Sequence, residues 1–120
     1  MKSYTDIEQS KRLAEILPLE SADMRYDEYI SYIDGTPKVG YKKGVTEGIP
    51  CWSLAALFSV IPKHIKDYNV LRIDISENDF AIWYDEIGYG VNTELPDITM
   101  ECPIDACVEM IVKLHELNIL

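Results

Sequence analysis

The chain has 120 residues, a length typical of one domain, and its 48% hydrophobic and 10% aromatic residues are typical of a folded protein. It carries 21 acidic residues against 11 basic ones, a formal net charge of −10. Because nucleic-acid backbones and anionic membrane surfaces are bound mainly through an excess of Lys and Arg, this charge disfavours both as direct partners. A protein with a basic surface stays open as a partner, as does an acidic surface that only keeps the chain soluble.

The cysteines and the apolar runs indicate the compartment. Cys51, Cys102 and Cys107 are an odd number and lack the regular spacing of a disulfide scaffold. The first ten residues are polar, and no apolar run reaches ~18 residues, so we expect neither a signal peptide nor a membrane span. The sequence therefore predicts a cytoplasmic protein.

A capping-box pattern opens the chain, with Thr5 at the cap and Glu8 three residues later. We expect a helix over 6–17, which ends there because Pro18 disfavours helical backbone in the residue before it. A stretch rich in Tyr and Ile over 24–33 then predicts a strand. A turn over 34–37 leads to a short second strand over 38–41.

The middle of the chain, Ile49–Ile61, is apolar on nearly every side and is interrupted only by Ser53 and Ser59. A helix without a polar face must be surrounded by other elements, so we expect a central buried helix here. Pro50 fits the first turn of that helix. Ser53 is an alternative cap that would start the helix later.

Regular alternation of apolar and polar residues predicts an antiparallel meander after this helix. We expect strands over 68–75 and 80–85 joined by a turn over 76–79, then a third strand over 91–94 and a loop over 95–101. The polar residues 63–67 would extend the central helix by one turn.

The last helix opens at Pro103, and one side of it is an apolar stripe formed by Ile104, Cys107, Val108, Ile111 and Leu114. These elements predict the α+β class. We expect a single two-layer domain over residues 1–120, with a small, mostly antiparallel sheet packed on the central buried helix and the terminal helices.

Cys51 is the first candidate for chemistry, because the start of a helix lowers a thiol pKa. The string CWSLAAL is also locally similar to the nucleophile helix of papain-type proteases. That family needs an upstream Gln, where this chain has Val45 and Thr46, and a His on a strand with an Asn partner. His64 and His115 are instead predicted in or beside helices. A buried apolar cysteine is the interpretation that we favour.

A metal site is the second candidate. Cys102 and Cys107 are separated by four residues, whereas zinc sites favour gaps of two and need four ligands. Adding His115 leaves the ligand set incomplete. We therefore predict no catalytic residue, no metal site and no cofactor.

Aromatic residues are the third candidate, because Tyr and Trp are enriched in protein interfaces. The predicted strands and turns carry more of them than a small core needs, and we select Tyr26, Tyr29, Trp83 and Tyr89 as partner-binding residues. Cross-strand aromatic pairing inside the sheet is the alternative.

Four segments that together cover nearly the whole chain carry a resemblance to other proteins. They are TDIEQSKRLAEILPLESADM, IPCWSLAALFSVIP, WYDE and PIDACVEMIVKLHELNIL. The chain resembles small uncharacterised acidic proteins of Bacteroidetes-type bacteria and their phages or mobile elements. The resemblance supplies no catalytic residue. Its usual helix start has Ala where this chain has Cys51, which weakens the nucleophile hypothesis.

These observations predict a non-enzymatic module for protein–protein interaction, an accessory protein of a phage or mobile element. It would bind another protein, or a second copy of itself as a homodimer, through an aromatic or acidic surface, with a DNA mimic as a special case. Two alternatives stay open. One is a small enzyme that uses Cys51 with a histidine, and the other is a small-ligand-binding domain with a pocket beside Trp52.

Overall fold

The computed structural model describes residues 2–26, 38–39 and 48–120. The described residues contain α-helices and antiparallel sheets, which confirms the predicted α+β class. They form two compact units, and we name residues 2–60 the N-terminal unit and residues 61–120 the C-terminal unit. That the whole chain is a single domain stays a prediction.

The N-terminal unit begins with helix α1 (Ile7–Ala14). Its capping box uses Asp6 and Gln9: Gln9 N donates to Asp6 Oδ1 at 2.8 Å, and Asp6 N donates to Gln9 Oε1 at 3.0 Å. The predicted cap at Thr5 was therefore wrong by one residue, because the Thr5 hydroxyl is buried and bonds elsewhere. The helix also ends three residues earlier than the predicted Leu17.

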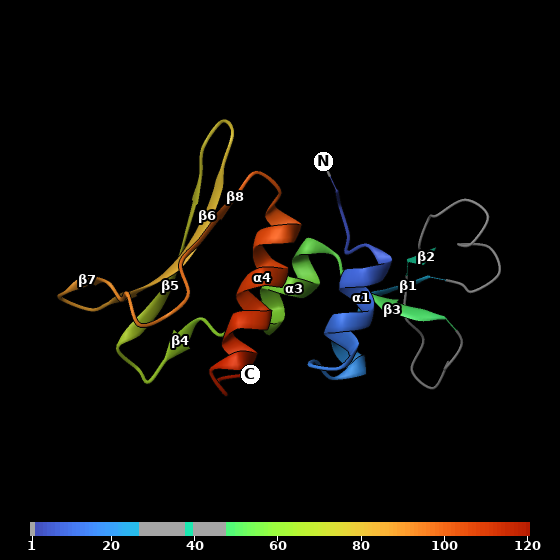
Figure 1. Cartoon of the computed structure of the whole chain (residues 1–120), viewed down its shortest axis with the longest axis horizontal. Helices are drawn as coiled ribbons and strands as arrows, with labels where there is room; N and C mark the ends of the chain where they lie inside the picture. The colour runs from blue at the N-terminus through green and yellow to red at the C-terminus, as the bar shows by residue number, and fades with distance from the viewer. Residues whose placement is uncertain (1, 27–37, 40–47) are drawn as a thin grey trace. The chain divides into compact units, whose positions relative to one another are not determined.

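A three-stranded antiparallel sheet follows, in the order β2–β1–β3, after a short 3-10 helix η1 (Leu19–Ser21). The strands are β1 (Met24–Tyr26), β2 (Lys38–Val39) and β3 (Ile49–Cys51). Helix α1 packs against β3 (Figure 1). β1 and β2 pair antiparallel, but Lys38 lies opposite Arg25, whereas the predicted turn over 34–37 would set it opposite Ile33, so the predicted register of the hairpin was wrong. The rest of the predicted strands and the turn between them lie outside the described residues.

The apolar middle of the chain is a strand followed by a helix, and the prediction of one long helix from Ile49 was wrong. Ile49–Cys51 pairs with β1, with Pro50 opposite Arg25. Helix α3 covers only Leu54–Val60. The alternative cap Ser53 is confirmed, since Ala56 N donates to Ser53 Oγ at 3.2 Å.

Helix α3 is also less buried than the absence of a polar face predicted. Its buried residues are Ala56 and Leu57, whereas Ala55 and Ser59 are exposed. These two side chains are small, so their exposure leaves little apolar surface in water. The helix therefore has a buried side and an exposed side.

The C-terminal unit contains a five-stranded antiparallel sheet in the order β4–β5–β6–β7, with β8 also paired to β6. The strands are β4 (His64–Ile65), β5 (Asn69–Ile75), β6 (Phe80–Glu86), β7 (Gly90–Val91) and β8 (Ile98–Met100). The predicted hairpin of β5 and β6 is confirmed to within one residue at each end.

Two strands of this sheet were missed. β4 replaces the expected extra helical turn, because Lys66 and Asp67 have φ angles of 52° and 57° and reverse the chain at once. β8 lies in the expected loop over 95–101. Strands of two or three residues are too short to show alternation, so the sequence offered no signal for either.

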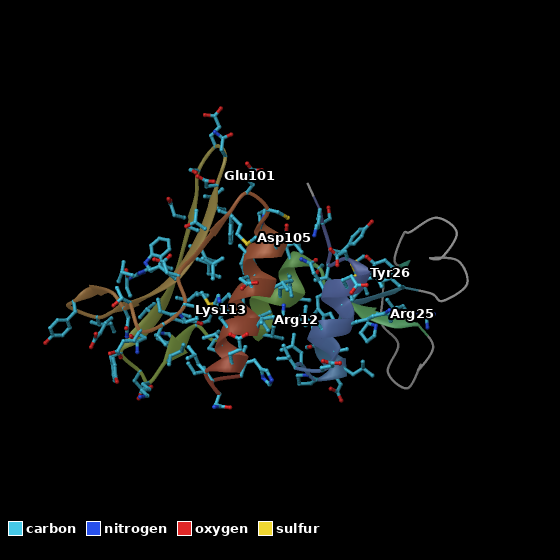
Figure 2. The ribbon with its side chains drawn as sticks, viewed as in Figure 1. Arg12, Arg25, Tyr26, Glu101, Asp105 and Lys113 are labelled. Atoms are coloured by element: carbon cyan, nitrogen blue, oxygen red, sulfur yellow. The ribbon has the colours of Figure 1, made fainter. Side chains whose placement is uncertain are left out.

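Helix α4 (Pro103–Glu116) covers part of one face of this sheet by packing against β6 and β8 (Figure 1). Its predicted apolar stripe is confirmed, since all five residues are buried. On the sheet, the side chains of Phe80, Ile82 and Tyr84 of β6 are also buried. The Tyr84 hydroxyl donates to Pro62 O at 2.7 Å. Figure 2 shows Glu101 and Asp105 near the start of α4 and Lys113 near its end.

None of the helices in the described ranges is long and apolar enough to cross a membrane.

Candidate functional site

Cys51 lies in a fully buried polar cluster of the N-terminal unit, which we define as Thr5, Ser10, Tyr26 and Cys51. The thiol donates to Thr5 O at 3.4 Å, and Thr5 Oγ1 donates to Cys51 Sγ at 3.6 Å. Tyr26 (labelled in Figure 2) donates its hydroxyl to the same Thr5 O at 2.7 Å. The cluster therefore joins the segment before α1 to both β1 and β3.

This cluster does not activate the thiol. Burial raises the pKa of Cys51, although hydrogen bonds from Thr5, Ser10 and Tyr26 oppose that effect. A cysteine nucleophile needs a thiolate that a substrate can reach. The prediction that Cys51 is buried is confirmed, but its surroundings are a hydrogen-bonded polar cluster and not purely apolar.

Cys102, Cys107 and the two histidines do not form a cluster. Burial raises the pKa of Cys107 to about 12, and Cys102 is only partly exposed. His64 is exposed on β4, and His115 Nδ1 lies 2.8 Å from Leu120 O. Within the ranges that the structure describes, no three His, Cys, Asp or Glu side chains are grouped to hold a metal ion.

A cavity of about 420 Å³ lies between β4, the chain after β7 and the end of the C-terminal unit. Its most buried polar residue is Asn69. Asn69 Nδ2 donates to Ile65 O at 3.1 Å, and Asn92 Nδ2 donates to Asn69 Oδ1 at 2.9 Å. Both amide atoms of Asn69 are thus already bonded within the C-terminal unit.

The small-ligand pocket beside Trp52 stays a prediction, because the cavity described above is lined only by residues of the C-terminal unit. Trp52 is fully buried, and its Nε1 donates to Ser21 Oγ at 2.9 Å. Its ring does not line the cavity just described.

The strongest candidate is the face of the five-stranded sheet that α4 does not cover, which we name the outer face. Residues opposite each other in antiparallel strands point to the same face. The register therefore places these residues on the outer face: Val70, Arg72 and Asp74 of β5, Ala81, Trp83 and Asp85 of β6, Val91 of β7 and Thr99 of β8. Among residues 61–120, all of them described, α4 is the only helix, and it lies on the other face.

Trp83 occupies the middle of the outer face and is held in place by polar neighbours. Its Nε1 donates to Asp85 Oδ1 at 2.8 Å, and Arg72, directly opposite Trp83 on β5, pairs with Asp85 Oδ2 at 3.2 Å. Trp83 is partly buried, with its ring fixed beside an ion pair. A fixed aromatic ring loses little conformational entropy on binding, which is typical of an interface anchor.

Exposed apolar residues continue from this face to one end of the sheet. We name Tyr68, Ile87, Tyr89 and Val91 the aromatic turn, where Ile87 N donates to Tyr68 O at 2.8 Å. All four are exposed, and Tyr89 is 83% exposed. Residues 61–120 also carry twelve acidic against four basic residues, a net charge of −8 out of −10. The C-terminal unit therefore combines exposed aromatic surface with most of the negative charge.

The four residues predicted to bind a partner separate in the structure. Trp83 and Tyr89 belong to the outer face and the aromatic turn of the C-terminal unit. Tyr26 belongs to the N-terminal unit and is only 4% exposed, so its selection as an exposed ring was wrong; it serves the buried cluster instead. Tyr29 lies outside the described residues.

Sequence reasoning missed two further exposed residues, Ile73 and Ile75 of β5. Their alternation with polar residues correctly predicted that they share a face with the core. The pattern contained no signal that α4 would leave them uncovered.

Comparison of the chain with protein-family models, with curated proteins and with solved structures found no match in any of the three.

Proposed function

We propose that this chain is a non-enzymatic interaction module that binds another protein through the outer face and the aromatic turn. The observation that carries the proposal is the exposure of Tyr89 and its neighbours beside a sheet face that has Trp83 at its centre. Antiparallel sheets often expose one face to water, but that face is then mainly polar. Here four of the eight residues on that face are apolar, namely Val70, Ala81, Trp83 and Val91.

The charge of the C-terminal unit supports a basic partner surface. Complementary charge accelerates association and selects the partner. We infer further, from the sequence resemblance alone, that the partner belongs to a Bacteroidetes-type host cell or to a phage or mobile element within it.

The test replaces Tyr89 with a photo-reactive amino acid, benzoylphenylalanine, in a cell of the native host. Illumination should yield a covalent adduct, because position 89 is 83% exposed and lies in the proposed binding surface. The matched control carries the same group at Glu116, an exposed position in the last turn of α4.

An adduct at position 89 and not at position 116 supports the proposal, and mass spectrometry identifies the partner. An adduct of twice the chain mass identifies a second copy of the chain and establishes the homodimer. Equal adducts at both positions, or none at either, overturn the proposal.

A further inference from the structure

The outer edge of β5 is unpaired beyond its first residues within the part of the chain that the structure describes. Strand β4 pairs only with Asn69 and Val70. One more bond follows, in which Leu71 N donates to Lys63 O at 2.9 Å. From residue 72 to residue 75, β5 is therefore an edge strand of the sheet.

The direction of the backbone groups along this edge follows from the ladder. In an antiparallel pair, residues alternate between bonding to the partner strand and pointing away from it. Since Leu71 N points outward to Lys63, the N–H and C=O groups of Ile73 and Ile75 also point outward. The edge thus presents two N–H donors with two C=O acceptors in a row.

The side chains beside these groups are apolar on one face, and the other face carries Asp74 and Arg72, of which Arg72 is paired with Asp85. Ile73 is 40% exposed and Ile75 is 75% exposed, although Ile82 and Phe80 directly opposite them on β6 are buried. Asp74 lies between them on the outer face. Exposed edges are usually protected by charged side chains, Pro or a bulge; the run Leu71–Ile75 contains no Pro and no bulge, and its two charged residues, Arg72 and Asp74, both lie on the outer face.

We propose that this edge accepts an extended segment of another protein, with alternating apolar and basic side chains, as an additional strand. The inference rests on the proposed function and names the chemistry of its partner. Apolar side chains of the incoming strand extend the core beside Ile73 and Ile75. Basic side chains lie on the outer face beside Asp74. Strand addition of this kind takes affinity from the main chain and specificity from alternate side chains.

A second copy of the chain fits this edge poorly. An antiparallel pairing centred on Ile73 would match Arg72 with Asp74 of the other copy, but it would place Ile75 opposite a Leu71 whose outward N–H already bonds to Lys63. A pairing centred on Asp74 would set two carboxylates against each other. Two units of net charge −8 also repel.

The probe is a fluorescein-labelled, end-blocked peptide of seven residues that alternates Lys and Val, and its control has Glu in place of Lys. Fluorescence anisotropy with the full chain at low salt should show saturable binding of the Lys peptide and none of the Glu peptide. Amide hydrogen exchange at Ile73 and Ile75 should slow when the Lys peptide is bound.

Ile75→Pro is the decisive variant, because proline removes the outward N–H while the bonds to β6 remain. We expect the affinity for the Lys peptide to fall about tenfold, as for one lost hydrogen bond. Ile75→Val is the matched control, since it keeps the N–H and a branched side chain, and it should bind within about twofold of the original chain.

Circular dichroism shows whether Ile75→Pro is folded. If it is not folded, Asp74→Lys becomes the deciding variant, and it should also weaken binding of the Lys peptide by about tenfold. Equal binding by the original chain and the deciding variant, or no binding of the Lys peptide at all, overturns the inference. If either result occurs while the adduct at position 89 still forms, the inference fails and the proposed function stands.

Discussion

Thr5 is the residue on which the buried cluster of the N-terminal unit depends, and replacing it with Val tests how much that cluster stabilises the fold. Thr5 uses nearly all its hydrogen-bonding capacity in buried surroundings. Its Oγ1 lies 2.8 Å from Ser10 Oγ and accepts from Trp52 N at 3.1 Å, while Thr5 N donates to Trp52 O at 3.0 Å. Valine has nearly the same shape, so Thr5→Val removes the hydroxyl and leaves no cavity.

The magnitude follows from the groups that lose a partner. Trp52 N and the Ser10 hydroxyl would both be buried without their bond to Thr5, and each such group costs about 1–3 kcal/mol. We expect Thr5→Val to lower the free energy of unfolding by roughly 2–5 kcal/mol. Urea denaturation followed by tryptophan fluorescence measures it, with the slope m compared to verify that the unfolding stays two-state.

Ser10→Ala provides the control through a double-mutant cycle. In the Thr5→Val background, Ser10→Ala removes a hydroxyl that has already lost this partner. The losses in free energy of unfolding of the two single variants should therefore sum to about 1 kcal/mol more than the loss of the double variant. A Thr5→Val chain that is destabilised by less than ~0.5 kcal/mol, or strict additivity, would refute the reasoning.

Three further predictions concern the thiols and the start of α3. Burial raises the pKa of Cys107 from 9.0 to about 12, so between these pH values the folded thiol stays neutral while the unfolded one ionises. The contribution of this thiol to the free energy of unfolding should therefore be fully present below pH 9. It should fall by up to ~1.4 kcal/mol per pH unit as the pH rises toward 12. Urea midpoints from pH 8 to pH 11 should fall less steeply for Cys107→Ala, and an identical slope would contradict this. In the native chain, the thiol reagent dithiobis(nitrobenzoate) should modify Cys102 first, and Cys51 and Cys107 should react only on unfolding. Rapid modification of all three cysteines would contradict the burial of Cys51 and Cys107. Asp23 accepts from Ser53 N at 2.9 Å and also from Ser53 Oγ, so Asp23→Ala should lower the melting temperature by the equivalent of about 1 kcal/mol, whereas Asp23→Asn, which keeps the acceptor for Ser53 N, should lose less.

The sequence predicted best where a pattern repeats over several residues. The alternation over β5 and β6 identified both strands, and the stripe on α4 identified its buried side, because each pattern has five or more members. The prediction failed over Ile49–Cys51, where continuous apolar sequence is compatible with a helix or a strand. Pairing with β1, about 25 residues away in the sequence, decides between them, and local sequence does not contain that information.

The candidate site was predicted in part. Trp83 and Tyr89 were selected because aromatic residues exceeded what a small core needs, and both lie on uncovered parts of the C-terminal unit. Tyr26 was selected for the same reason and is buried, because its hydroxyl finds an acceptor in Thr5. Whether a Tyr ring is buried depends on a distant acceptor, which composition alone does not show.

Each unit contains one of the two tryptophans, with Trp52 fully buried among residues 2–60 and Trp83 partly buried in the sheet of residues 61–120. The chain therefore carries a built-in optical reporter for each half. Replacing one indole at a time by Phe would yield two emission signals whose melting curves either superimpose or separate. Superimposed curves would mean that the halves lose structure as one cooperative body, and separated curves would mean that each melts by itself.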